Sequence, residues 1–298
     1  SVEVPIRIML NLFDSLVASV LNYSCEVWGF LKADNLERVH KKFLKWLIGV
    51  KMSTSNSALY GEFGRYPLYV TRQIRIVKYF LRIYTEKRNN CILFTVLNNL
   101  RNDCERNNNV VNWASNVRKI LQNTGFNDVW LFPKSVDIKF FIPIFKIRIV
   151  DIFKNEWRID ITTKSSLSLY KEFKTVFQLS PYLEMLKCVQ HRNIIAKLIL
   201  SSHQLNIETG RHRNIARTDR KCELCETNDI EDEYHFVMIC PVYRLLRIHY
   251  IPRFYYVRPS MANFLDLLNC SNANVLNRLA VFCIKAFKQR QNELNYLY

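Results

Sequence analysis

The feature that most constrains this chain is a set of three cysteines and one histidine in a short segment near its C-terminal end. Cys222 and Cys225 are separated by two residues, and His235 and Cys240 follow after gaps of nine and four residues. Thiolate and imidazole groups at such spacings are typical ligands of tetrahedral zinc sites. The pattern predicts that the four side chains meet at one Zn²⁺ ion. Because four ligands fill the coordination shell, we expect this zinc to be structural.

The rest of the chain predicts a mainly α protein. It has 298 residues, of which 49% are hydrophobic, and only six glycines and eight prolines for the turns of a β fold. Apolar residues recur at helical spacing in several long segments. We expect helices over residues 5–22, 36–48, 68–86, 110–121 and 274–292. Helix and strand both fit residues 140–149, and the asparagine-rich residues 87–109 predict loops or frayed helix ends.

The charge predicts a polyanionic partner. Lys and Arg number 43 against 26 Asp and Glu, which gives a formal net charge of +17. An excess of this size favours RNA or DNA as the partner. The alternative is a basic helical interaction protein that has a structural zinc site and binds an acidic protein.

Three groups of basic residues are the candidate phosphate contacts. The first helix face carries Arg38, Lys41, Lys42 and Lys45. The second carries Arg72, Arg75, Lys78 and Arg82. The flanks of the metal motif carry Arg211, Arg213, Arg217, Arg220, Lys221, Arg244 and Arg247.

The sequence holds no glycine-rich phosphate loop, no GxSxG elbow and no paired aspartates after a strand-like run. We therefore predict no catalytic residues and no enzymatic activity of the chain by itself. Acidic residues between the two halves of the metal motif favour a solvated turn over a second metal site. The scattered cysteines predict a reducing, intracellular compartment. No segment predicts a membrane span.

Several motifs resemble the C-terminal part of non-LTR (LINE-type) retrotransposon reverse transcriptases. The resemblance is carried by residues 202–211, 220–225, 230–236 and 240–247 around the metal motif, and by residues 12–17, 26–29, 38–43 and 60–68 upstream. It is weak over residues 87–180. Two positions depart from the family pattern: Ser24 stands where a glycine usually follows the tyrosine, and Ile199 stands where an arginine is expected.

The resemblance implies a thumb-like helical domain over residues 1–86, a helical connector over 87–188, a zinc-binding region over 189–255 and a C-terminal helical segment over 256–298. It also implies that polymerase and endonuclease domains precede this part in the same polyprotein, and that the protein acts in nucleus and cytoplasm. The thumb helices would lie against the template–product duplex. The zinc region would hold element RNA or target DNA during target-primed reverse transcription.

Overall fold

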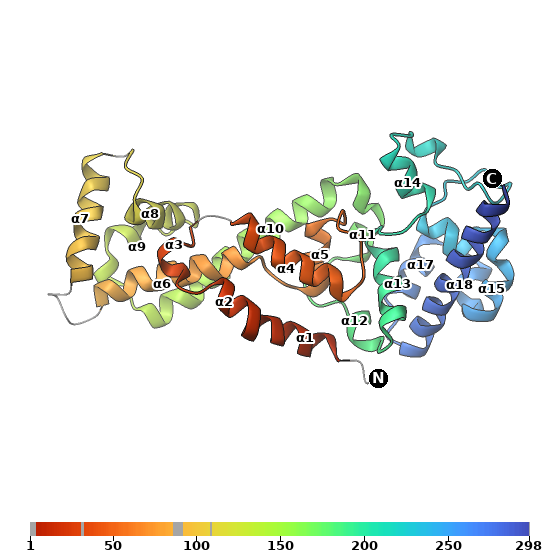
Figure 1. Ribbon diagram of the computed structural model, residues 1–298, viewed down its shortest axis with the longest axis horizontal. Coiled ribbons are helices and arrows are strands. Elements are labelled where there is room, and N and C mark those ends of the chain that lie inside the picture. Colours follow the sequence, from red (N-terminus) through yellow and green to blue (C-terminus); the bar gives the residue numbers. More distant parts are fainter. Residues whose placement is uncertain (1–3, 31–32, 86–91, 108, 298) are drawn as a thin grey trace. The chain divides into compact units, whose positions relative to one another are not determined.

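The structure is a computed structural model that describes residues 4–30, 33–85, 92–107 and 109–297, with side chains to residue 295. The described residues form helices and turns, and their only β pairs are the isolated bridges Phe63–Leu179 and Lys221–Ile230. The expected mainly α fold is therefore confirmed (Figure 1). None of the described helices combines the length and the apolarity that a membrane crossing needs.

The chain divides into two compact units, each made of segments that are distant in sequence. Unit 1 comprises Ser1–Asn11, Lys41–Arg65 and Arg158–Tyr298, and unit 2 comprises Leu12–His40 and Tyr66–Trp157. Three of the boundaries fall inside helices, namely α1 (Ile6–Leu12), α4 (Asp34–Leu47) and α10 (Ile138–Thr163). The division of the sequence into four consecutive regions remains a prediction.

Unit 2 is built around a hydrophobic core to which five helices contribute. Its helices, besides its parts of α4 and α10, are α2 (Ser19–Leu21), α3 (Cys25–Trp28), α6 (Leu68–Thr85), α7 (Ile92–Arg106), α8 (Trp113–Asn123) and α9 (Asn127–Leu131), with a π-helix η1 (Phe13–Ala18) and a 3-10 turn η2 (Pro133–Ser135). Phe80 of α6 stacks on Trp130 of α9 at 5.7 Å between ring centroids. Phe145 of α10 is fully buried in the same core. Stacked aromatic side chains bury large apolar areas, so they hold these short helices together.

Two expectations for unit 2 are corrected. Residues 92–106 of the asparagine-rich segment form α7, because Leu97 and Cys104 fall on one helix face and are buried in the core. Glu86 to Cys91 and Asn108 lie outside the described residues. The helix expected over residues 5–22, which reaches from unit 1 into unit 2, contains the π-helix η1 in place of a continuous α-helix, and Leu16 in η1 is 65% exposed.

Other expectations for unit 2 are confirmed. Residues 140–149, where the sequence left helix and strand open, are helical throughout, inside α10. The expected helix over residues 110–121 is α8, which starts at a capping box between Asn112 and Ser115. The chain leaves α8 through Gly125, whose φ of 81° is a backbone conformation that glycine adopts without strain.

Unit 1 contains the metal motif and packs it against the closing helix. Its helices, besides parts of α1, α4 and α10, are α5 (Asn56–Phe63), α11 (Ser168–Phe173), α12 (Tyr182–Met185), α13 (Val189–Ile199), α14 (Asn206–His212), α15 (Arg244–Tyr250), α16 (Arg253–Val257), α17 (Met261–Leu268) and α18 (Ala273–Leu297). The 3-10 turns η3 (Ser165–Leu167), η4 (Arg217–Asp219) and η6 (Pro241–Tyr243) and the π-helix η5 (His235–Ile239) connect them. The helix α18 packs against α13 and α15, and its residues Leu276, Leu279 and Phe282 are fully buried. The ring of Phe236, next to the predicted ligand His235, stacks on Phe287 of α18 at 4.4 Å.

Candidate metal centre

The first half of the metal motif is a short antiparallel hairpin. The amide of Cys222 donates to Asp229 O at 3.0 Å, and the amide of Glu231 donates to Arg220 O at 2.9 Å. Asn228 turns the chain with a φ of 59°, in the left-handed region that asparagine tolerates better than most residues. The hairpin places Cys222 and Cys225 on the same side of the turn, as the two-residue gap predicts.

The second half of the motif is one turn of π-helix. His235 begins η5, and its amide donates to Asp232 Oδ1 at 2.8 Å. The amide of Cys240 donates to His235 O at 2.8 Å, which is a hydrogen bond between residues five apart. This wider turn ends at Cys240, so the four-residue gap brings the imidazole and the thiol to one place.

The four ligand atoms form one compact cluster. All of them lie within 4.8 Å of one another, and this is the one such cluster of His, Cys and acidic residues found among the described residues. His235 Nε2 lies 3.4 Å from Cys225 Sγ. In a tetrahedral site with metal–sulfur bonds of about 2.3 Å, ligand atoms are roughly 3.8 Å apart. The arrangement therefore fits one four-coordinate metal ion, once the more distant ligand atoms move slightly closer together.

The imidazole has a carboxylate on its far side. His235 Nδ1 lies 3.6 Å from Asp229 Oδ2, and the ring is buried. That distance is longer than a hydrogen bond. Nδ1 has no hydrogen-bond partner among the described groups. A carboxylate behind a histidine ligand fixes the ring orientation and its tautomer. Asp229 is placed for that role, and Nε2 is the nitrogen that faces the cysteines.

The buried thiols of the cluster shift one another's pKa. Hydrogen bonding to Cys240, together with burial, raises the pKa of Cys222 to about 12. The same hydrogen bond from Cys222 lowers the pKa of Cys240. Metal binding at thiols releases protons, because thiolates are the metal ligands.

Arg247 supports the cluster from inside the protein. Its guanidinium donates to Val237 O at 2.7 Å and to Cys240 O at 2.8 Å, and the residue is buried. Arg220 likewise donates to Ile215 O and Ile207 O, at 2.9 and 3.0 Å. Both were predicted as phosphate contacts. Their side chains instead satisfy backbone carbonyls, since buried carbonyls need donors.

The acidic segment between the two halves is partly buried, which differs from the expected solvated turn. Glu231 accepts two hydrogen bonds from Arg290 of α18, at 2.7 and 2.6 Å. Glu233 accepts hydrogen bonds from Ser201 Oγ at 3.1 Å and from His203 Nε2 at 2.9 Å. These carboxylates attach the metal hairpin to the rest of unit 1. Sequence reasoning missed this role because the partners lie at least thirty residues away in the chain.

The structure separates the predicted basic contacts into three classes. The exposed ones are Arg38, Lys42, Arg75, Lys78, Arg82, Arg213, Arg217 and Arg244, while Lys41 and Lys221 are half-buried. The others are engaged inside the protein: Arg72, Lys45 and Arg247 are buried, Arg220 binds carbonyls, and Arg211 pairs with Glu208 at 2.6 Å.

The position of Arg72 corrects the expected surface face of α6. Its side chain is fully buried and lies 3.4 Å from Glu37 Oε1. The Glu37 carboxylate also accepts the amides of Leu68 and Tyr69 at 3.1 and 2.9 Å, so it caps the start of α6. A carboxylate at a helix N-terminus is favourable, and it turns Arg72 inward.

Lys45 is also placed differently from the expected face of α4. It is buried, and its Nζ donates to Met52 O at 2.6 Å. Burial, reinforced by the charge of Lys41, lowers its pKa. The helical spacing correctly groups Lys45 with Arg38, Lys41 and Lys42, but the segment that follows α4 folds over it.

No family model, no curated protein and no solved structure matches this chain.

Proposed function

We propose that the four-residue cluster binds zinc and that this zinc is structural. Three thiols and one imidazole form a soft donor set, and such donors bind zinc in preference to the harder calcium and magnesium ions. The four protein ligands complete a tetrahedral shell and leave no position for water or substrate. The metal ion holds together a hairpin that has only one β bridge of its own.

We further propose that the chain is a non-catalytic nucleic-acid-binding region. The observation that carries this proposal is the exposed basic segment leading into the metal cluster. Arg213 and Arg217 are exposed, and Lys221 lies at the first strand of the hairpin. A metal ion that fixes this segment holds its cations in place for phosphate groups. The net charge of +17 supports a polyanionic partner.

The exposed face of α6 supports the same proposal in unit 2. Arg75, Lys78 and Arg82 line one side of a hollow of about 500 Å³, with Tyr79 among them. Cations spaced along a helix can follow a phosphate backbone.

On this proposal the chain is the thumb, connector and zinc-binding part of a LINE-type reverse transcriptase. It would hold element RNA or target DNA during target-primed reverse transcription, while upstream domains polymerise. Ser24 supports this assignment, because its φ of 49° lies where glycine is favoured and the family pattern has glycine there. A coding sequence that continues upstream into a palm with paired aspartates tests the assignment; an unrelated upstream reading frame contradicts it.

A matched pair of double variants tests nucleic-acid binding. Arg213→Gln with Arg217→Gln removes two exposed charges beside the cluster, and Lys171→Gln with Lys288→Gln removes two exposed charges elsewhere. We expect the first pair to weaken binding of a labelled RNA or DNA by about tenfold and the control to change it little. An equal loss of binding in both double variants would mean that the overall positive charge, and not this segment, attracts the nucleic acid. Tight binding of an acidic protein with no affinity for either nucleic acid would favour the protein-partner alternative.

A further inference from the structure

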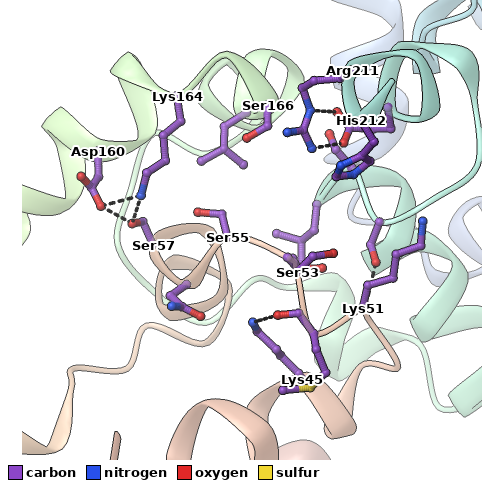
Figure 2. A pocket seen from close by; sticks show the side chains of 18 residues that line it. Lys45, Lys51, Ser53, Ser55, Ser57, Asp160, Lys164, Ser166, Arg211 and His212 are labelled. Carbon is purple, nitrogen blue, oxygen red and sulfur yellow. Dashed lines mark hydrogen bonds and ion pairs between the residues drawn. The ribbon is translucent and has the colours of Figure 1, made fainter. Parts of the chain in front are cut away.

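A polar pocket lies in unit 1 beside the start of α5, away from the metal cluster. Its volume is about 470 Å³, and the segment from Lys51 to Ser57 forms one wall. Figure 2 shows Lys164 with Ser57 and Asp160 on one side of the pocket, and Arg211 with His212 on another. Hydroxyl groups and basic side chains dominate the wall. None of the described metal ligands belongs to it.

The start of α5 presents unsatisfied polar groups to this pocket. The N-cap residue Ser55 makes no side-chain hydrogen bond to the helix. Thr54 is only 8% exposed, and neither its Oγ1 nor Ser55 Oγ has a hydrogen-bond partner among the described groups. The first turn of a helix also directs amide N–H groups outward without helical acceptors. Buried hydroxyls without partners are unfavourable, so a ligand that accepts hydrogen bonds would satisfy them.

The charges around the pocket leave two ammonium groups without a carboxylate. Asp160 pairs with Lys164 at 2.8 Å, and Glu208 pairs with Arg211 at 2.6 Å. Lys45 is 5% exposed and donates only to Met52 O in the described contacts. The remaining cation, Lys51, donates its Nζ hydrogen to His203 O at 2.8 Å. The pocket therefore has surplus positive charge as well as surplus hydrogen-bond donors.

We propose that this pocket binds a phosphate group, held by the Thr54 and Ser55 hydroxyls, the first turn of α5 and the ammonium group of Lys45. A helix N-terminus favours an anion through its amide groups and its dipole. Burial lowers the pKa of Lys45, and an anion beside it offsets that desolvation. The volume exceeds that of one phosphate, so the rest of a nucleotide or of a strand end fits beside it. This inference stands apart from the nucleic-acid proposal, because free phosphate suffices to test it.

The test is a titration of the full chain with inorganic phosphate at constant ionic strength, with chloride as the reference anion. Backbone amide chemical shifts are measured at each step of the titration. We expect saturable shifts of the Asn56 and Ala58 amides with phosphate but not with chloride. Lys45→Met should weaken phosphate binding by about tenfold, because it removes one charge-assisted hydrogen bond. The control Lys171→Met changes an exposed lysine outside the pocket and should bind phosphate as the wild type does.

A second variant covers the case in which Lys45→Met does not fold. Thr54→Val keeps the side-chain shape and removes the buried hydroxyl, and Ser271→Ala removes an exposed hydroxyl elsewhere as its control. Weaker phosphate binding in Thr54→Val alone supports the site. The absence of saturable shifts in the wild type, or equal weakening in a variant and its control, overturns it.

Competition distinguishes the two sources of the phosphate. A single-stranded oligonucleotide that displaces inorganic phosphate from the pocket identifies a strand as the ligand. A nucleoside monophosphate that displaces it when an oligonucleotide does not identifies a free nucleotide. If the pocket binds phosphate while the chain binds neither RNA nor DNA, the site stands and the proposed function fails.

Discussion

Arg290 of the closing helix holds Glu231 of the metal hairpin in a buried two-point ion pair. The Nε and Nη2 atoms of Arg290 lie 2.7 and 2.6 Å from the two carboxylate oxygens. The same carboxylate accepts the amide of Asn206 at 2.7 Å. One side chain thus joins the metal region, α14 and α18. The geometry satisfies the carboxylate on both sides, which a buried charge requires.

Removing the arginine of this pair should destabilise unit 1 strongly. Arg290→Met leaves the Glu231 carboxylate buried without its cation, at a cost of about 3–5 kcal/mol in the free energy of unfolding. Lys288→Met, an exposed neighbour on α18, is the control and should change the free energy by less than about 0.5 kcal/mol. Urea denaturation measures both. Equal midpoints for Arg290→Met and the wild type would show that the ion pair does not hold the hairpin.

The metal cluster predicts about one zinc per chain by elemental analysis. Cys225→Ser should reduce the metal content and increase amide hydrogen exchange over residues 211–250, because metal binding and local folding are coupled. Cys270→Ser changes a half-buried cysteine outside the cluster and should alter neither quantity. If Cys225→Ser keeps its metal content and its protection from amide hydrogen exchange, Cys225 is not a ligand.

Arg244 and Arg247 lie one helical turn apart on α15, but their substitution should affect different properties, stability for Arg247 and nucleic-acid binding for Arg244. Arg247→Met leaves the carbonyls of Val237 and Cys240 without a donor, so it should cost about 2–3 kcal/mol of stability. Arg244 is exposed, and Arg244→Met should leave stability unchanged while weakening nucleic-acid binding. Thermal unfolding and binding anisotropy on both variants check this. The reverse pattern would contradict the structural role of Arg247.

Glu62 in α5 predicts a specific dependence of stability on pH. Burial raises the pKa of its carboxyl above the ordinary value of 4.5, although the charge of Lys174 and hydrogen bonds oppose the shift. Its contribution to stability is therefore fully present below about pH 4.5 and is lost as the pH rises through the pKa in the folded protein.

The isosteric variant Glu62→Gln should be as stable as the wild type near pH 4 and progressively more stable than it towards pH 8. The exposed Glu172→Gln is the control. Urea denaturation at a series of pH values gives the difference. A difference between variant and wild type that does not change with pH would mean that Glu62 titrates as it does in the unfolded chain.

The ligand cluster and most helices could be predicted from the sequence because they depend on local spacing. Gaps of two and four residues bring Cys222 and Cys225, and His235 and Cys240, to one point through a hairpin and a single turn. The helix α7 was missed, because its asparagines oppose helix formation locally while the burial of Leu97 and Cys104 favours it through tertiary packing.

The roles of the arginines could not be predicted, because they depend on distant partners. Helical spacing places Arg72 on a cationic face, yet Glu37, thirty-five residues earlier, draws it into the protein. In the same way, Arg247 donates to the carbonyls of Val237 and Cys240, and Arg220 donates to those of Ile207 and Ile215. Sequence periodicity gives the direction of a side chain from its own helix. It does not show which other segment covers that face.

The most direct test of the nucleic-acid function is the salt dependence of binding to an RNA or a DNA duplex. If about four of the exposed cations contact phosphates, the logarithm of the binding constant should fall with the logarithm of salt concentration with a slope of about −3 to −4. The double variant Arg213→Gln with Arg217→Gln should reduce the magnitude of that slope by about 2, one unit for each lost contact. A slope near zero for the wild-type chain would contradict the proposed function.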